Sequence, residues 1–218
     1  MAASVATTDG RVPGRRGRAT RQRLLEATTD LLATTPWRSV RVIDIARRAG
    51  TSPATFYQYF ENVESAIGVL AEELVEDAAG LAELAEADWS APASWRSAVC
   101  FCEGFFAYWE ANRALFWVLD LAADSDTPLR GVRVRALNAV TMALARVVAA
   151  RAPDERADGP VAGPGRRSVA TAVSLIAMLA SVARQRPALE DRGVAFADLV
   201  ASEADLLHWA VTGRPGPP

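Results

Sequence analysis

The chain has 218 residues but only one histidine and two cysteines, and all of its basic residues are arginine. His208 has neither a second histidine nor clustered thiolates beside it in the sequence, which argues against a zinc site and a catalytic constellation. Cys100 and Cys102 would point to different faces of a helix, so they suit neither a disulfide nor a shared metal. We therefore expect no metal, no cofactor and no enzymatic activity.

Long apolar runs are also missing. The sequence contains no stretch of 18 apolar residues, and its N-terminus lacks the apolar segment of a signal peptide, so we expect a cytoplasmic protein without a membrane span. Alternation of apolar and polar residues between turn signals is absent too, which argues against strands. Half of the residues are hydrophobic and they recur at helical spacing, so the sequence predicts an all-α fold.

Charge is distributed unevenly along the chain. Residues 1–60 contain ten arginines and four acidic residues, a net charge of +6. Residues 61–218 contain fourteen arginines and twenty-two acidic residues, a net charge of −8. This contrast suggests that only the N-terminal part meets nucleic acid. Within that part, the sequence Arg-Arg-Gly-Arg at 15–18 suits a flexible arm in a minor groove and a solubilising tail equally well.

Residues 42–60 carry the most informative pattern in the chain. Apolar residues at helical spacing predict a short helix over 42–49. Gly50 follows it, as expected where the residue after a helix needs a positive φ. Ser52 is a favourable N-cap and Pro53 suits the first helical position, so a second helix is expected to begin there.

The second helix has two contrasting faces. Phe56 and Phe60 fall together and are expected to point inward, whereas Gln58 lies opposite them. The flanks hold small, hydrogen-bonding or phenolic side chains, namely Ala54, Thr55, Tyr57 and Tyr59. A helix in the DNA major groove needs this arrangement, because Gln pairs with adenine and small side chains contact a thymine methyl. An ordinary helical hairpin has the same faces, so the pattern alone leaves both interpretations open.

Over about residues 20–70 the chain resembles the TetR family of bacterial transcriptional repressors. The matching residues are Ile-Ala-Arg-Arg-Ala-Gly-Thr-Ser at 45–52 and Thr-Phe-Tyr-Gln-Tyr-Phe at 55–60. A helix expected over 20–34 precedes them, and a long helix beginning near Asn62 follows. The last part of the match is most similar to the EthR-type members of the family.

Four positions depart from the family pattern. Arg41 stands where many members have Thr or Ser, Thr51 replaces the usual Val or Ile of the turn, and Val63 replaces a phosphate-contacting Lys. The Gly that usually follows the first helix is missing from residues 34–37. The resemblance still implies binding to a double-stranded operator with an inverted repeat. The candidate DNA-binding residues are Arg18, Arg41, Ser52, Ala54, Thr55, Tyr57, Gln58 and Tyr59.

The remainder of the chain is expected to form a larger helical domain. Helices are predicted from Asn62, from Ser94, and over 113–121, 128–150, 167–185 and 196–211, with a Pro- and Gly-rich loop at 152–165. The predicted domains are a disordered basic arm at 1–17, a DNA-binding domain at 18–62, a ligand-binding and dimerisation domain at 63–212, and a tail at 213–218.

Aromatic side chains are dense over residues 95–117. For any single residue a well-packed core explains this density, but the resemblance implies an inducer site, and such cavities are mostly apolar with a few polar groups. We therefore expect a pocket for a small hydrophobic ligand. Its candidate residues are Trp95, Cys102, Phe105, Trp109, Phe116, Trp117, Asn138, Met142, Ser174 and Met178.

The last two predicted helices carry wide apolar stripes. Family members pair such helices with those of a second copy in a four-helix bundle, so the resemblance implies a homodimer. The alternative is that these stripes are buried entirely within one copy. The candidate interface residues are Ile176, Ala180, Leu207 and Val211.

These patterns together predict a two-domain, homodimeric repressor that a small apolar ligand releases from its operator. Two other classes of protein remain open at this stage. One is a DNA-binding regulator that acts without a ligand or as an activator. The other is a helical interaction protein that has lost DNA binding.

Overall fold

The structure is a computed structural model that describes residues 14–90, 93–122, 129, 131–151, 164–214 and 216. Over these residues the secondary structure is helical and includes no strand, which confirms the all-α prediction. The chain divides into two compact units. The head unit comprises Met1–Glu76 and Asn112–Val134, and the body unit comprises Asp77–Ala111 and Arg135–Pro218. The predicted domain boundary between residues 62 and 63 stays a prediction.

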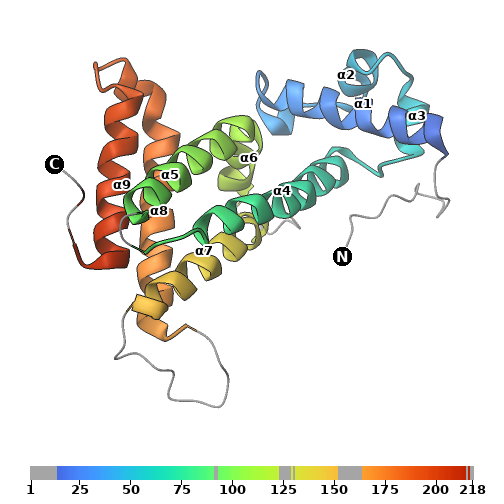
Figure 1. The fold of residues 1–218 in the computed structure, drawn as a ribbon. Coiled ribbons are helices and arrows are strands. Elements are labelled where there is room, and N and C mark those ends of the chain that lie inside the picture. The colour runs from blue at the N-terminus through green and yellow to red at the C-terminus, as the bar shows by residue number, and fades with distance from the viewer. Residues whose placement is uncertain are drawn as a thin grey trace. The chain divides into compact units, whose positions relative to one another are not determined.

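Within the described residues, the head unit contains one long helix, three shorter helices, one 3-10 helix and the first part of a second long helix (Figure 1). Its elements are α1 (Arg15–Leu32), the 3-10 helix η1 (Trp37–Ser39), α2 (Val42–Arg48), α3 (Pro53–Tyr57), the first part of α4 (Val63–Ala85) and α6 (Arg113–Ala122). Helix α1 packs on α2 and on α6, and α2 packs on α3. The fully or almost fully buried side chains of the head unit include Leu24, Leu25, Ile45, Phe56, Phe60 and Ile67.

Helix α1 begins earlier than the sequence pattern indicated. Its first residue is Arg15 rather than Thr20, and Gly14 precedes it in an extended conformation. The last residues of the predicted arm are therefore helical, because arginine is a good helix former and no capping residue delays the start. Residues 1–13 of the arm lie outside the described residues.

The turn between α2 and α3 has the predicted geometry. Gly50 adopts a φ of 66°, in the left-handed region that favours glycine. The Ser52 Oγ accepts a hydrogen bond from the Thr55 backbone N–H at 3.2 Å, and Pro53 occupies the first helical position. This cap fixes where the second short helix starts.

Helix α4 is capped as predicted. The Asn62 Oδ1 accepts from the Ser65 backbone N–H at 2.8 Å, and the Ser65 Oγ accepts from the Asn62 backbone N–H at 3.2 Å. This reciprocal pair satisfies two backbone donors at the start of the helix. The helix is continuous from Val63 to Ala85, so its first part belongs to the head unit and its last part to the body unit.

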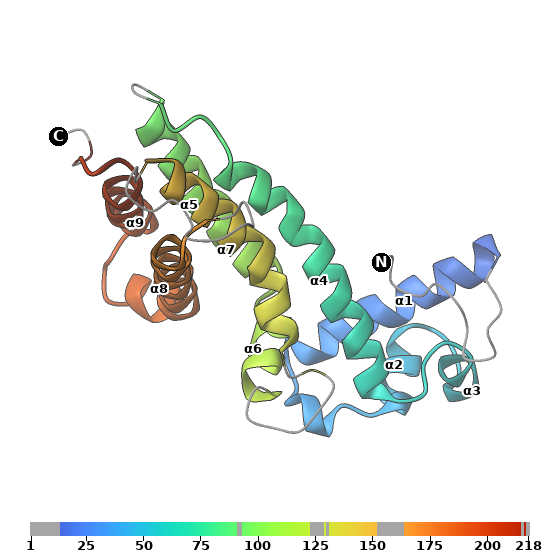
Figure 2. The ribbon, with the colours of Figure 1, turned by 90° about the horizontal axis from the view of Figure 1, so that it is seen from below.

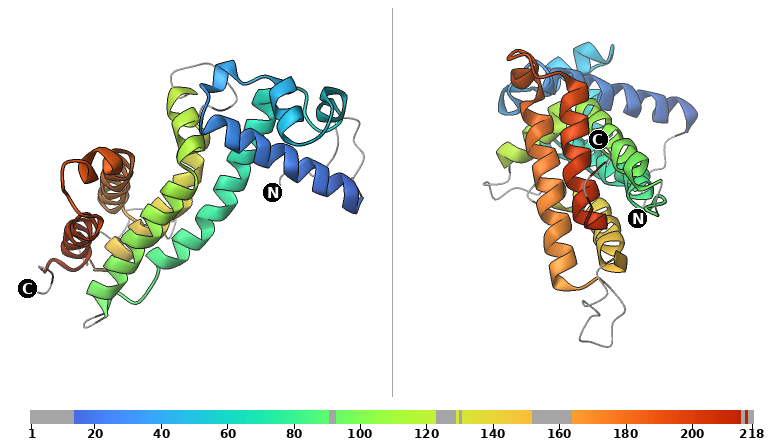
Figure 3. Two further views of the ribbon diagram at one scale, coloured as in Figure 1. Left: turned by 90° about the horizontal axis from the view of Figure 1, so that it is seen from above. Right: turned by 60° about the vertical axis from the view of Figure 1, so that its left-hand side comes forward.

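The body unit contains longer helices (Figures 2 and 3). They are the last part of α4, α5 (Ser94–Ala111), α7 (Val132–Arg151), α8 (Arg166–Glu190) and α9 (Phe196–Thr212). Helix α5 packs on α9 and α8, and α8 and α9 lie side by side. Helices α5 and α9 are antiparallel, because Ser94 contacts His208 at one end and Phe106 contacts Phe196 at the other.

Two helix boundaries in the body unit differ from the predictions. Helix α7 begins at Val132 rather than at residue 128, which lies outside the described residues. Helix α8 continues to Glu190, past the predicted end at residue 185. Pro187 lacks a backbone N–H but lies in the last turns of α8, and its carbonyl still accepts from the Asp191 N–H at 3.0 Å.

Helix α8 is, within the described part of the chain, the one helix long and apolar enough to cross a membrane, and 39% of its most apolar window is buried inside the structure. Core helices of soluble proteins pass the same test. Since α8 packs on both α5 and α9, its apolar composition is explained by the core of the body unit.

His208 is a packed residue, in agreement with the sequence interpretation. Its Nδ1 lies 3.2 Å from the Arg214 carbonyl and its Nε2 lies 3.0 Å from the Ser94 Oγ. Because a carbonyl can only accept, Nδ1 is the donor to Arg214, and Nε2 forms the hydrogen bond with the Ser94 hydroxyl. The contact joins the start of α5 to the residues that follow α9.

Glu203 on α9 is a buried acid in the same core. Within the described residues its Oε2 has no hydrogen-bond partner. Burial raises the pKa of this carboxyl to about 7. Burial also raises the pKa of the Cys102 thiol on α5, and the charge of Glu203 adds to that effect. The Glu203 carboxylate is therefore a source of instability in its ionised form.

The pH dependence of unfolding tests this description of Glu203. The folded pKa lies above the ordinary value of 4.5, so the folded protein binds more protons between about pH 4.5 and 7, and the free energy of unfolding falls as pH rises through that window. At pH 8, Glu203→Gln is expected to stabilise the protein by roughly 1–3 kcal/mol. Thermal unfolding at pH 5 and pH 8 measures this, and an effect of equal size at both values would contradict it.

Candidate nucleic-acid interface and ligand-binding core

Helix α3 presents its predicted faces. Phe56 and Phe60 are buried in the head unit, with ring centroids 5.3 Å apart. Ala54 and Tyr57 are exposed on this short helix, and Gln58 is exposed at its C-cap. We call these three residues the recognition face. The rear of α3 is thus fixed by burial, while small, phenolic and amide side chains remain accessible to a partner.

Two other candidate DNA-binding residues, Thr55 and Tyr59, are less accessible than the recognition face. Thr55 is half-buried, and its Oγ1 lies 3.0 Å from the Ser52 Oγ. Tyr59 is half-buried beside Phe60, with ring centroids 6.5 Å apart. Ser52 is exposed but serves as the N-cap of α3. These three side chains hold the recognition face in place, and their direct contact with DNA stays a prediction.

Arg21 on α1 contacts two other parts of the head unit. It is buried, its guanidinium lies 5.6 Å from the centre of the Phe60 ring, and its Nη1 is 3.9 Å from the Glu73 carboxylate on α4. A cation over an aromatic face is favoured by the ring's charge distribution. The contact therefore braces Phe60 from the side of α1.

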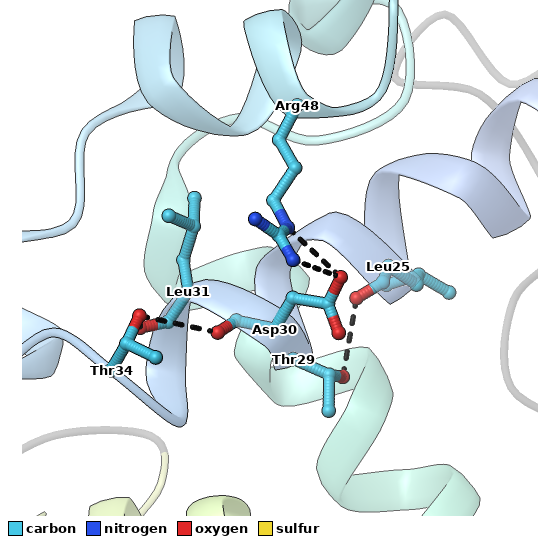
Figure 4. Close-up of polar contacts among 6 residues, drawn as sticks. All are labelled: Leu25, Thr29, Asp30, Leu31, Thr34 and Arg48. Atoms are coloured by element: carbon cyan, nitrogen blue, oxygen red, sulfur yellow. Dashed lines mark hydrogen bonds and ion pairs between the residues drawn. The ribbon is translucent and has the colours of Figure 1, made fainter.

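A second tie joins α1 to α2 (Figure 4). The Arg48 Nε and Nη2 lie 2.9 Å and 2.8 Å from the Asp30 carboxylate. Both side chains are about half-exposed, so this ion pair contributes little to stability. It does fix the orientation of both side chains at the C-terminal ends of α1 and α2.

A group of arginines lies just before α2 and along it. Arg41 and Arg47 are exposed and both contact Asp44, and Arg38 lies over the Trp37 ring with its guanidinium carbon 5.2 Å from the ring centre. Of these three arginines, only Arg41 is among the DNA-binding candidates predicted from the sequence. The spacing of three residues between Asp44 and Arg47 was the available signal, because such pairs meet on one helix face.

Arg18 lies exposed on α1 and its contact with DNA stays a prediction.

The predicted pocket residues divide between the two units. Phe116 and Trp117 belong to the head unit, where Phe116 is buried and Trp117 is exposed. The remaining eight belong to the body unit. On α5 the buried Phe105 and Trp109 rings are stacked with centroids 6.3 Å apart, and Cys102 is buried on the same helix. We call Cys102, Phe105 and Trp109 the α5 aromatic stripe.

The two polar side chains predicted to line the pocket do not face the core of the body unit. Asn138 on α7 and Ser174 on α8 are exposed, and Ser174 bonds to its own helix through the Ala170 carbonyl at 3.0 Å. The buried face of α7 is instead formed by small and aliphatic side chains, namely Ala136, Val140, Ala143 and Leu144. Trp95, Met142 and Met178 are half-buried. A pocket role for these residues stays a prediction.

The four predicted interface residues are buried within their own chain. Ile176, Ala180, Leu207 and Val211 all pack into the body unit, so for them the alternative of burial within one copy holds. The physical reason is that α5 covers this face of α8 and α9. The exposed apolar side chains of the same two helices are others, namely Val173, Phe196, Leu206 and Trp209.

Two family models match the chain. The model for bacterial regulatory proteins of the tetR family matches residues 24–65, and the model for a tetracyclin repressor-like C-terminal domain matches residues 81–217. The second model alone covers more than half of the chain. It extends the relationship beyond residues 20–70, where the sequence resemblance lay.

Solved structures of this family share the fold. A TetR-family transcriptional regulator from Rhodococcus sp. is 19% identical with a TM-score of 0.62, covering 87% of this chain and 98% of its own. FadR from Bacillus subtilis in complex with stearoyl-CoA is 17% identical with a TM-score of 0.62, covering 88% and 98%. FadR from Thermus thermophilus in complex with lauroyl-CoA is 18% identical with a TM-score of 0.51, covering 91% and 98%.

No curated protein matches the chain. The similarity to EthR-type members stays a prediction, because the matches name the family and not that subgroup. The two family models match residues 24–65 and 81–217, and the structure from Rhodococcus sp. shares the helical fold over 87% of the chain. The chain belongs to the TetR family of DNA-binding bacterial transcriptional regulators.

Proposed function

We propose that this protein is a cytoplasmic, homodimeric repressor that binds an inverted-repeat operator and is released from it by a small apolar ligand. The observation that carries the proposal is the recognition face of α3, with Ala54, Tyr57 and Gln58 exposed above the buried Phe56 and Phe60. A major-groove helix needs an anchored rear and accessible amide or small side chains in front. Chromosomal operators lie in the cytoplasm, which supports the proposed location.

Gln58 and Tyr57 are proposed to have different roles at the DNA. The Gln58 amide can pair with both hydrogen-bonding groups of adenine in the major groove, so it distinguishes bases. The Tyr57 hydroxyl at the edge of the same helix is proposed to contact a phosphate, which has the same chemistry at every sequence.

Base and phosphate contacts can be separated by mutation. Gln58→Ala is expected to weaken specific binding by roughly 1–3 kcal/mol and to relax the preference at one base position. Tyr57→Phe is expected to weaken binding to operator and scrambled DNA by the same factor. Fluorescence anisotropy on both duplexes measures this. The assignment of faces is wrong if Gln58→Ala leaves base preference unchanged.

The body unit supplies the proposed ligand site. The α5 aromatic stripe places two stacked rings and a thiol within an apolar core, which suits a hydrophobic molecule. Two structural neighbours were solved with stearoyl-CoA and lauroyl-CoA, whose acyl chains are apolar, which supports a ligand with an apolar part. Because α4 belongs to both units, a ligand that displaces its last part can alter its first part beside α3.

Ligand binding is testable with stearoyl-CoA and a panel of lipophilic compounds. An inducer is expected to raise the melting temperature, perturb tryptophan fluorescence, and weaken operator binding over the same concentration range. A coupling of about 1–3 kcal/mol would reduce operator affinity several-fold to a hundred-fold. Cys102→Leu should remove the response by filling space beside the rings. Cys100→Leu, two residues away on the exposed face of α5, is the matched control.

A panel that stabilises nothing and leaves operator binding unchanged would instead favour a regulator that acts without a ligand.

The proposed dimer uses the exposed face of α8 and α9. Leu206 and Trp209 on α9 are 46% and 62% exposed, and Val173 on α8 is also exposed. Large apolar side chains in such a cluster commonly mark an interface. A second copy would cover them and place two head units on one operator, which suits an inverted repeat.

Charge placed in this face should separate the copies. Leu206→Asp is expected to give a folded monomer that loses most of its operator affinity, because an interface buries the new carboxylate without a partner. Val134→Asp, at an exposed apolar residue outside α8 and α9, is the control and should stay dimeric. Light scattering and circular dichroism measure mass and helicity. A monomeric unmutated protein would end the dimer proposal.

A further inference from the structure

Asp44 on α2 holds two arginines at once. Its Oδ2 accepts from the Arg41 Nε at 3.1 Å, and its Oδ1 accepts from the Arg47 Nη2 at 2.8 Å. The carboxylate is recessed, with 17% of its side chain exposed, whereas the Arg41 and Arg47 side chains are 74% and 78% exposed. One largely buried carboxylate therefore holds two exposed guanidinium groups.

The local backbone explains why the three side chains meet. Arg41 is the residue before α2, has an extended conformation with φ −116° and ψ 148°, and makes no capping bond with its side chain. Asp44 lies in the first turn and Arg47 in the last, one helical turn further on. Residues three apart lie on the same helix face, so the carboxylate reaches both neighbours.

Each arginine gives only part of its hydrogen-bonding capacity to Asp44. A guanidinium has five N–H donors, and the hydrogen bond of each arginine to Asp44 uses one nitrogen. The remaining donors have the planar geometry that binds a phosphate. A flexible arginine loses side-chain entropy when it binds, so a side chain already held in place contributes more to binding.

Helix α2 is also fixed relative to the recognition face. It packs on α3, and the Thr51 backbone N–H after the turn donates to the Ala46 carbonyl at 2.9 Å. Arginines held on α2 therefore keep a constant position relative to Gln58. Phosphate contacts set the register of a protein on DNA, and base contacts distinguish sequences only in the correct register.

We propose that Asp44 is a positioning residue for DNA binding, which orients Arg41 and Arg47 toward the phosphate backbone and so sets the register in which Gln58 meets the bases. The proposal rests on DNA binding by the head unit. It has an unexpected consequence, because removing an acid from a DNA-binding surface should reduce sequence discrimination while it strengthens general attraction to DNA.

The test compares Asp44→Asn with Asp30→Asn. Both variants remove one negative charge from the head unit and one carboxylate partner of arginine, but Asp30 pairs with Arg48 between α1 and α2. Binding is measured on a duplex enriched from a random library by the unmutated protein and on a scrambled duplex of equal length, over a range of salt concentrations. Circular dichroism confirms that each variant is folded at the assay temperature.

Both variants should bind the scrambled duplex more tightly, because one repulsive charge is gone. Only Asp44→Asn should lower the ratio of specific to scrambled affinity, by roughly three- to tenfold. Asp44→Glu, which keeps the charge but shifts the carboxylate, should leave scrambled binding unchanged and reduce the ratio partially. In an Arg41→Gln, Arg47→Gln background, Asp44→Asn should cause no further loss of discrimination.

Equal effects of Asp44→Asn and Asp30→Asn on the ratio would show that charge alone matters and would overturn the proposal. Retention of full discrimination by both Asp44→Asn and Asp44→Glu would do the same. If Asp44→Asn is unfolded, Asp44→Glu and the arginine background decide the question. A failure of the unmutated protein to enrich any duplex would count against operator binding itself and not against the role of Asp44.

Discussion

Burial of Phe56 and Phe60 is the constraint on which the head unit depends. Helix α3 spans only Pro53–Tyr57, too short to be stable by its own hydrogen bonds. Its position comes from two aromatic side chains inserted into the core, a serine cap at its start and a glycine turn before it. Everything exposed on α3 is placed by what is buried beneath it.

Contacts around these two rings also fix the orientation of α3. Arg21 covers one side of Phe60, and the capped start of α4 follows directly after it in the chain. The packing of α1 on α2 holds α2 in place, and the ion pair between Arg48 and Asp30 orients those two side chains. The recognition face is therefore carried by a rigid frame, which favours precise contact with DNA.

In the body unit, favourable apolar packing is opposed by the cost of one buried acid. Its core combines the α5 aromatic stripe with a buried acid, Glu203, whose Oε2 has no partner in the described residues. A polar group left in this state costs stability, and such groups in native proteins call for a functional or solvent explanation. The packing of α5 on α9 therefore stabilises the body unit less than burial of the apolar side chains alone would.

Much of this structure was predictable from the sequence. Local signals located Gly50, Ser52, Pro53 and Asn62 correctly, because turns and caps depend on a few adjacent residues. The inward direction of Phe56 and Phe60 followed from helical periodicity.

Burial in the body unit was harder to predict, because periodicity identifies an apolar stripe and not its partner. Ile176 and Leu207 were assigned to a dimer interface, yet α5 covers them within the same chain. The two contacts of Asp44 were also missed, since only Arg41 of its two arginine partners was a candidate from the sequence. Such errors arise wherever a side chain's environment is supplied by distant parts of the chain.

Hydroxyl-radical footprinting of the enriched duplex tests the central claim most directly, because it shows how many head units bind and where. The account predicts two protected patches related by two-fold symmetry, on one face of the DNA, with centres about one helical turn or a small multiple of it apart. A single asymmetric patch, or protection that does not depend on sequence, would contradict it.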